Sequence, residues 1–242
     1  MHQLSRTSPE GLFADRLAED RAQPLVTYYD QSSGERAELS AASLANWVTK
    51  TFFLLTDELG LEVADRAAVR LPVHWMRYVV LLGAWSAGLT VVADTDAAVA
   101  FSHDPDDLST LAGTVPEVFG LALAPWGQGY PAEPPAGAAD FVAAVRPQPD
   151  VFAQVRFPAD PSIEATPGMS RAGFAAAARE RATDLFLGAG GRLLIHSSSP
   201  HADDLLTWIA PLAAAGSVVL VSGGSAADTT RLAEVERATV VI

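Results

Sequence analysis

The stretch from residue 40 to residue 94 constrains the fold most, because it alternates helix and strand patterns over short connections. Ser40 is a favourable N-cap, Gly60 is a favourable helix end, and the apolar residues between them recur at helical spacing. The apolar run 67–71 is typical of a buried parallel strand, and the helix after it is apolar on nearly every side. In chain order we expect helix 40–59, strand 67–71, helix 74–87 and strand 89–93. This order predicts a βαβ crossover.

The segments on either side extend the same α/β pattern. Before residue 40, Ser8-Pro9 opens a helix, and the turn residues 30–34 join two strands in a hairpin. The further expected strands are 25–29, 35–39, 97–101, 115–123, 151–157, 192–195, 216–221 and 239–242, and the further helices are 104–111, 138–145, 171–187, 205–215 and 226–238. Residues 1–242 are predicted to form one α/β domain, with a mostly parallel sheet flanked by helices. A sub-boundary, if there is one, falls in the Pro/Gly-rich loop 124–137.

Composition excludes several classes of partner. The 242 residues carry a formal net charge of −13, whereas binding to nucleic acid or to an anionic membrane requires a basic face. No apolar run approaches the length of a membrane span, and residues 1–22 are polar and mixed in charge, unlike a signal peptide. The chain contains no cysteine, which rules out disulfides and thiolate metal sites. We therefore expect a cytoplasmic protein that binds neither nucleic acid nor membrane.

Three phrases in the chain resemble a known family. Residues 64–72 read ADRAAVRLP, followed by Trp75, and residues 82–92 read LGAWSAGLTVV. They resemble the phrases GDRVALLLPNSPEW and LLGAWKAGAVVVPL of the AMP-binding, adenylate-forming enzymes, which include acyl-CoA synthetases, amino-acid adenylation domains and luciferases. Residues 205–221 resemble a later phrase of that family, LLAPLLAGATVVLV. The resemblance covers most of this chain but only about the first half of the enzyme fold, so it implies a fold like the N-terminal half of such an enzyme.

The chain departs from the family where the enzymes bind the phosphates of ATP. Family members carry a loop that reads roughly YTSGTTGRPKG, whose backbone amides, hydroxyls and lysine hold the phosphates. At the corresponding place, residues 160–170 read DPSIEATPGMS, which keeps little of that pattern and has no lysine. Glu164 would repel phosphate there, and the only lysine of the chain, Lys50, lies in an early helix. We interpret the segment as a deleted triphosphate site, and the resemblance then implies a protein without adenylate-forming activity.

Polar residues at the ends of later strands predict a small-ligand site. Loops at the carboxyl ends of parallel strands are where open α/β sheets bind their ligands. The candidate ligand-binding residues are Thr166, Gly168, Ser197, Ser198 and His201. Their hydroxyl and imidazole groups offer hydrogen bonds but little positive charge, so a neutral or acyl ligand fits better than a polyphosphate. We predict no catalytic residue, cofactor or metal ion for this site.

The histidines and aspartates of residues 196–204 could in principle gather a metal ion. We interpret them as a polar loop that caps the following helix, because no spacing among them is diagnostic of a metal site. Pro200 is expected in or near the first turn of that helix. Asp203 and Asp204 are favoured beside it by the helix dipole.

Three functions stay open on the sequence. The first is a degenerate adenylate-forming-enzyme-like domain that is not catalytic and binds a small ligand or a protein. The second is half of an acyl-CoA synthetase or a similar ligase, completed by a partner chain. The third, a remote alternative, is a Ser-His-Asp hydrolase, because residues 168–172 approximate a nucleophile elbow around Ser170. Its partners would be Asp184 and either His196 or His201.

The composition also predicts an assembled protein. In full-length relatives, further sheet and helices cover this half of the fold. The present chain, with 49% hydrophobic and 19% charged residues, has little polar material for such a face. Large apolar faces and free strand edges are normally covered in proteins. We therefore expect a homodimer that buries at least roughly 1,000 Å², with a different protein partner as the alternative.

Overall fold

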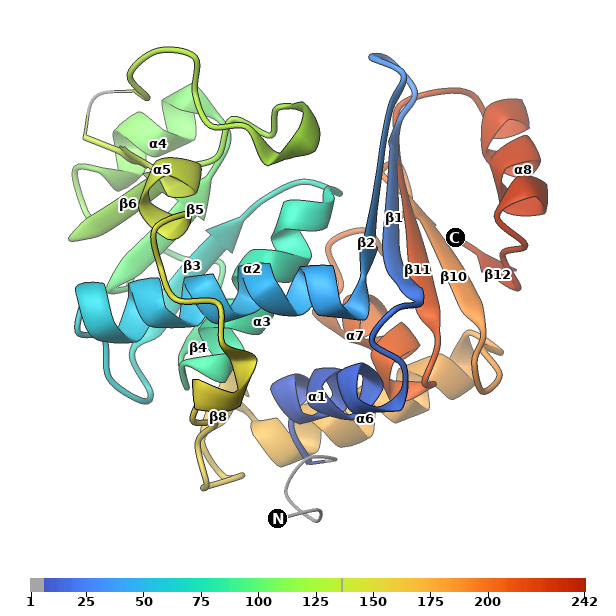
Figure 1. The fold of residues 1–242 in the computed structure, drawn as a ribbon, viewed down its shortest axis with the longest axis horizontal. Helices are drawn as coiled ribbons and strands as arrows, with labels where there is room; N and C mark the ends of the chain where they lie inside the picture. Colours follow the sequence, from blue (N-terminus) through green and yellow to red (C-terminus); the bar gives the residue numbers. More distant parts are fainter. Residues whose placement is uncertain (1–6, 136) are drawn as a thin grey trace. The chain divides into compact units, whose positions relative to one another are not determined.

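The computed structural model describes residues 7–135 and 137–242 of the chain (Figure 1). Two compact units make up the chain, and each contains a five-stranded sheet. Unit 1 comprises Met1–Leu44, Pro72–Trp75 and Ala172–Ile242, and unit 2 comprises Ala45–Leu71 and Met76–Arg171. The loop 124–137, where the sequence places a sub-boundary, lies within unit 2.

The sheet of unit 1 is mostly parallel. Its strands follow the order β12-β10-β11-β1-β2, in which β1 and β2 pair antiparallel and the other neighbours pair parallel. The strands are β1 Pro24–Asp30, β2 Glu35–Ser40, β10 Arg192–His196, β11 Ser217–Ser222 and β12 Val240–Val241. The central strand β11 reads SVVLVS, and its four apolar residues are all buried. An uninterrupted apolar run is typical of a strand whose two faces are both covered. The parallel pairing brings the carboxyl ends of β10, β11 and β1 to one edge.

Helices cover both faces of this sheet. They are α1 Pro9–Glu19, α6 Arg171–Asp184, α7 Leu205–Ala213 and α8 Ala226–Val235. Helix α8 packs on the face that carries Leu194 and Val221, and Figure 1 shows α7 on the other side of the sheet. The side chains of Ser8 and Ser225 accept backbone N–H groups at the first turns of α1 and α8. These caps explain why both helices begin where the sequence predicts.

The sheet of unit 2 is parallel throughout, in the order β4-β3-β5-β6-β7. Its strands are β3 Arg66–Arg70, β4 Thr90–Val92, β5 Val99–Ser102, β6 Glu117–Gly120 and β7 Ala139–Asp140. The associated helices are α2 Ala41–Phe53, which continues into the π-helical turn Leu54–Glu58, α3 Trp75–Ser86, α4 Pro105–Leu111 and α5 Phe141–Val145. Every residue of α3 is buried, as its apolar sequence predicts. Helix α4 packs through Leu108 and Leu111 against Ala68 and Ala100 of the sheet.

A short antiparallel hairpin lies beside the edge strand β4 of unit 2. Its strands are β8 Glu164–Thr166 and β9 Met169–Ser170. The Thr90 hydroxyl, at the start of β4, donates a 3.1 Å hydrogen bond to the Glu164 carbonyl oxygen. The buried Trp85 indole N–H donates a 2.9 Å hydrogen bond to the carbonyl oxygen of Ala165. These two bonds fix the hairpin to β4 and α3.

The α/β fold with mostly parallel sheets flanked by helices is confirmed, and two local predictions are wrong. Residues 151–157, expected as a strand, instead close a 3₁₀ turn at Phe152–Gln154, because their backbone bonds are local. The helix expected at 138–145 begins only at Phe141, because Ala139 and Asp140 pair with β6 as strand β7. The Asp140 side chain then caps α5. Within residues 7–135 and 137–242, no helix is long and apolar enough to cross a membrane.

Candidate functional site

The hairpin before α6 holds two of the predicted ligand-binding residues, Thr166 and Gly168. Thr166 ends β8, and Gly168 occupies the turn with a φ of 76°, a conformation that favours glycine. The Gly168 N–H donates a 3.0 Å hydrogen bond to the carboxylate of Glu164, four residues earlier. The turn is therefore closed on itself by an internal carboxylate. An incoming anion would have to displace that carboxylate and would meet its negative charge.

A cavity of about 390 Å³ lies beside this hairpin. It is lined by Ala64, Arg66, Thr90, Ser162, Ile163, Glu164 and Pro167. Arg66 and Thr90 are the first residues of β3 and β4, so this cavity lies at the amino-terminal edge of the sheet. Our prediction placed the ligand at carboxyl ends of strands, and the hairpin does not lie there. The Arg66 guanidinium pairs with Asp94 and Asp96, which balances the positive charge beside the cavity.

The loop after β10 holds the other three predicted residues, Ser197, Ser198 and His201. It lies at the carboxyl edge of the unit 1 sheet, where Ser197 N–H continues the β10–β11 pairing through the Val221 carbonyl oxygen. The Ser197 hydroxyl accepts the Gly223 N–H at 3.4 Å. The His201 N–H donates to the Ser199 hydroxyl at 3.2 Å, which folds the loop back on itself.

His196, the last residue of β10, links this loop to the next strand connection. Its Nδ1 lies 2.7 Å from the Ser198 hydroxyl oxygen and 3.1 Å from the Ser198 backbone nitrogen. Its Nε2 lies 2.9 Å from the carbonyl oxygen of Gly223, which follows β11. The imidazole therefore has a partner on each ring nitrogen, and Ser198 is one of them.

The predicted residues thus form two separate groups. Thr166 and Gly168 belong to unit 2, whereas Ser197, Ser198 and His201 belong to unit 1. Within unit 1, the hydroxyl of Ser198 contacts the His196 ring, whereas the hydroxyl of Ser197 accepts the Gly223 N–H. That the two groups serve one ligand stays a prediction.

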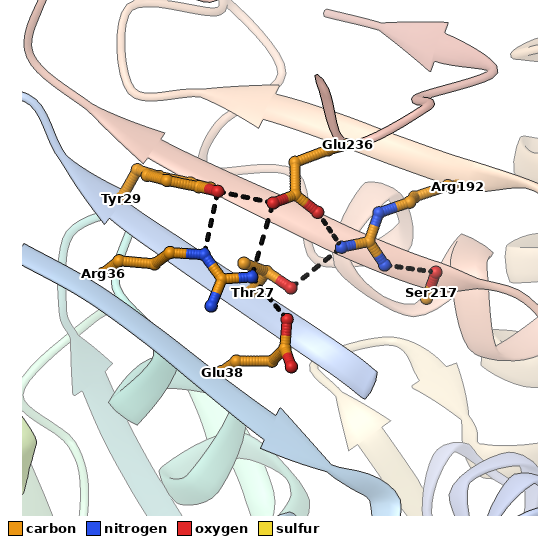
Figure 2. Close-up of polar contacts among 7 residues, drawn as sticks. All are labelled: Thr27, Tyr29, Arg36, Glu38, Arg192, Ser217 and Glu236. Carbon is orange, nitrogen blue, oxygen red and sulfur yellow. Dashed lines mark hydrogen bonds and ion pairs between the residues drawn. The ribbon is translucent and has the colours of Figure 1, made fainter. Parts of the chain in front are cut away.

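A polar network occupies the face of the unit 1 sheet that α8 covers (Figure 2). Its members are Thr27, Tyr29, Arg36, Glu38, Arg192, Ser217 and Glu236. Glu236, the C-cap residue of α8, accepts hydrogen bonds from the Tyr29 hydroxyl at 2.5 Å and from Arg192 at 2.5 Å. Arg192 also donates to the hydroxyl groups of Thr27 and Ser217. Through Tyr29, Arg192 and Arg36, Glu236 fastens the end of α8 to strands β1, β10 and β2. The network is therefore a structural element of the fold.

The network changes the acidity of its members. Burial alone would raise the pKa of the Glu236 carboxyl, but the hydrogen bonds from Tyr29 and Arg192 and the charge of both arginines lower it below the usual value. Burial, followed by the hydrogen bond to Glu236, raises the pKa of the Tyr29 phenol. At neutral pH the carboxylate is therefore ionised and the phenol is protonated, which is the state that the hydrogen bonds require.

Comparison with known proteins identifies the relatives of this chain. No protein-family model matches it. A protein of Mycobacterium tuberculosis (strain ATCC 25618 / H37Rv), described as a TIGR03089 family protein, is 34% identical over 234 residues, which are 93% of this chain and 94% of that protein. The chain belongs to the TIGR03089 family.

Solved structures show which fold this TIGR03089 family member has. It superimposes on acetoacetyl-CoA synthetase from Streptomyces lividans with a TM-score of 0.76 at 18% identity, covering 97% of this chain and 42% of that one. The superposition on the acyl-CoA synthetase of Brucella canis has a TM-score of 0.73 at 19% identity. It covers 97% of this chain and 46% of that one. The superposition on VinN in complex with 3-methylaspartate has a TM-score of 0.69 at 16% identity. It covers 97% of this chain and 65% of that one.

The chain therefore spans between 42% and 65% of the length of these three solved structures. The predicted fold family is confirmed: this TIGR03089 family member has the fold of an N-terminal part of the adenylate-forming enzymes.

The geometry of the family member gives no support to the hydrolase alternative. Ser170 is the second residue of the two-residue strand β9, and its φ is not positive, whereas a nucleophile elbow needs a sharp strained turn at the serine. The carboxylate of Asp184, at the end of α6, is in an exposed residue. Among the described residues, no group of three or more histidine, aspartate or glutamate side chains could hold a metal ion.

The predicted capping loop is confirmed in its main feature. The Asp204 side chain accepts the Leu206 N–H at 3.0 Å and the Thr207 hydroxyl at 2.8 Å, and it pairs with Arg181 at 3.2 Å. Pro200, expected in or near the first turn of this helix, instead lies in the turn that precedes it, since α7 starts at Leu205.

Two hydrogen bonds at the candidate site residues of this TIGR03089 family member could not be predicted from the sequence. The first is the hydrogen bond from the Gly168 N–H to the Glu164 carboxylate, because the sequence alone shows Glu164 only as a charge that would repel phosphate. The second is the bond between His196 and Gly223, which are 27 residues apart in sequence. A spacing of two residues between His196 and Ser198 is the one signal that pointed to their contact, and it is too common to be diagnostic.

Proposed function

We propose that this protein is a non-catalytic relative of the adenylate-forming enzymes that binds a small neutral or acyl ligand and forms no acyl-adenylate. The observation that carries the proposal is the closed hairpin at 164–170, in the place where the resemblance expects the phosphate loop. Its turn amide, on Gly168, is already bonded to the Glu164 carboxylate. Formation of an adenylate concentrates negative charge on phosphate oxygens, and stabilising that charge requires free donors and cations.

The only lysine of the chain offers no replacement for the missing charge. The Lys50 ammonium donates a 2.9 Å hydrogen bond to the carbonyl oxygen of Arg146 and a second bond to that of Gln148, all within unit 2. An ammonium held by two backbone carbonyls is occupied in the folded protein. This arrangement supports a structural role for Lys50.

The carboxyl edge of the unit 1 sheet supports the choice of ligand. Ser197 and Ser198 are exposed there, and His201 is half-buried beside them. These groups donate and accept hydrogen bonds without a fixed positive charge, so they suit a carbonyl or hydroxyl group better than a phosphate. We propose that the ligand is bound at this loop, without a cofactor. A cytoplasmic location stays a prediction.

Two measurements test the proposed function. The first is substrate-dependent ATP–pyrophosphate exchange by the purified chain, with a panel of fatty, aryl and amino acids; we expect none, and exchange with any of them would overturn the proposal. The second is calorimetry with Mg-ATP, AMP and acyl N-acetylcysteamine thioesters, which present an acyl group without the phosphates of CoA. We expect heat from a thioester and none from the nucleotides.

A pair of variants locates the ligand. His201→Ala should weaken thioester binding at least about tenfold, because it removes a group at the proposed site. Ser109→Ala is the matched control, since Ser109 is exposed on α4 of unit 2 and bonds only within its own helix turn at Pro105. Ligand-induced NMR shifts that mapped to the hairpin turn 30–34 would show that the site is misplaced.

A further inference from the structure

The tautomer of His196 follows from its two sets of partners. A carbonyl oxygen can only accept, so the 2.9 Å contact with the Gly223 carbonyl requires a proton on Nε2. A backbone N–H can only donate, so the 3.1 Å contact with the Ser198 nitrogen requires a lone pair on Nδ1. The neutral imidazole therefore carries its proton on Nε2 and presents a basic Nδ1 to Ser198.

The Ser198 hydroxyl is consequently the donor in its contact with the imidazole. Its oxygen lies 2.7 Å from Nδ1, which is within the reach of a general base. The Gly223 carbonyl holds the ring from the far side and stabilises the imidazolium that forms when Nδ1 takes up a proton. A hydroxyl, a base and a group that orients the base are the three parts of an activated nucleophile.

The position of this dyad makes the hydroxyl accessible. His196 is in register with Val221 of β11, and Val221 with Tyr29 of β1, so the imidazole lies on the face of the sheet that α8 covers. The imidazole is half-buried, whereas Ser198 is exposed in the turn after β10. The base is thus held by the sheet while its nucleophile faces solvent.

We propose that Ser198 is a nucleophile that accepts an acyl group from activated acyl esters, with His196 as its general base. The Ser198 Oγ attacks the carbonyl carbon while its proton passes to His196 Nδ1. The tetrahedral adduct then expels the alcohol or thiol, which takes that proton back, and an acyl-serine ester remains. Atoms and charge balance without a further reactant. Because the loop is open to solvent, we expect slow acylation, which ends at one acyl group per chain without turnover.

This inference goes beyond the proposed ligand-binding function and does not depend on it. A chain that binds no free thioester could still be acylated at Ser198. A chain that binds one reversibly could leave the serine unmodified. The proposed function and this inference are tested separately: calorimetry measures reversible binding, whereas the experiment below measures a covalent product at one residue.

The test treats the full chain with p-nitrophenyl acetate. Release of p-nitrophenolate is followed in time, and the acetyl group is located by peptide mass spectrometry. We expect one acetyl group per chain on Ser198, accompanied by a burst of p-nitrophenolate. His196→Gln should lower the acetylation rate of Ser198 by about a hundredfold, the low end for loss of a general base. Ser198→Ala should abolish the burst.

Ser109→Ala is the matched control, because Ser109 is also exposed but lies on α4 of unit 2, where its hydroxyl donates to the Pro105 carbonyl oxygen and not to an imidazole. Its burst should equal that of the unchanged protein. Thermal unfolding of each variant checks the fold, and labelling of the unchanged chain by a fluorophosphonate, which selects activated serines, gives a readout that needs no variant. Acetyl groups spread evenly over Ser197, Ser198 and other hydroxyls, or no fluorophosphonate label on Ser198, would overturn the proposal.

Discussion

Glu236 connects the end of α8 to the sheet of unit 1, and replacing it tests the network of Figure 2. Its carboxylate accepts from Tyr29 and Arg192 at 2.5 Å each and lies 3.5 Å from Arg36. The side chain of Glu236 is 10% exposed, whereas that of Arg36 is 45% exposed. We predict that Glu236→Gln destabilises the chain, because the amide carries no charge and cannot serve both partners as an acceptor.

The magnitude follows from the contacts. A hydrogen bond to a charged group contributes about 1.5–3 kcal/mol, and breaking a fully buried ion pair costs about 3–5 kcal/mol. Arg192 is 16% exposed, so water partly compensates for its lost partner. The exposed contact with Arg36 adds at most about 1 kcal/mol. Glutamine keeps one acceptor, so we expect the free energy of unfolding to fall by about 2–3 kcal/mol.

The pH dependence provides the sharper test. The pKa of Glu236 is lowered in the folded protein, so the stabilisation is fully present above the carboxyl's unfolded pKa of about 4.3 and is lost as the pH falls through the lower folded value. The difference in unfolding free energy between the unchanged protein and Glu236→Gln should therefore be constant near pH 7. It should shrink progressively below about pH 4.

The assay is urea denaturation followed by tryptophan fluorescence, since Trp208 is fully buried in unit 1. Glu234→Gln is the matched control: this glutamate lies two residues earlier in α8, carries the same charge and is exposed. It should change the free energy of unfolding by no more than about 0.5 kcal/mol. Equal losses in the two variants, or a loss in Glu236→Gln that persists unchanged in acid, would refute the reasoning.

Two further predictions concern packing and assembly. A Cβ added at Gly216 would lie 2.0 Å from the backbone oxygen of Gly191, so Gly216→Ala should lower the free energy of unfolding by about 3 kcal/mol in urea titrations. Gly188→Ala, whose Cβ meets nothing within 4 Å, should change it by about 0.5 kcal/mol, and similar losses in both would contradict the clash. We also predict a homodimer through the edge strand β12, where Val241 is 48% exposed. Light scattering across a dilution series should show it dissociate in Val241→Lys, and a monomer of the unchanged chain at micromolar concentration would contradict the prediction.

Local patterns in the sequence were sufficient for most elements of the fold. The apolar composition of α3 predicted its complete burial, and the Ser8 and Ser40 positions predicted helix starts, because a cap needs only its own next turn. The alternation of helix and strand patterns over residues 40–94 predicted the crossover between β3 and β4, because the periods of helix and strand are properties of a short window. The hairpin that holds Thr166 and Gly168 was not predicted, because its strands Glu164–Thr166 and Met169–Ser170 are too short to show a period in the sequence.

Contacts between distant parts of the chain were decided only by the tertiary structure. Tyr29 and Glu236 are 207 residues apart and share a 2.5 Å hydrogen bond, which exists because β1, β11 and β10 are neighbours in the sheet. The same strand order brings the Gly223 carbonyl to His196 and thereby selects the imidazole tautomer that faces Ser198. A sequence shows which residues prefer a strand, but the order in which strands pair depends on the burial of all of them together.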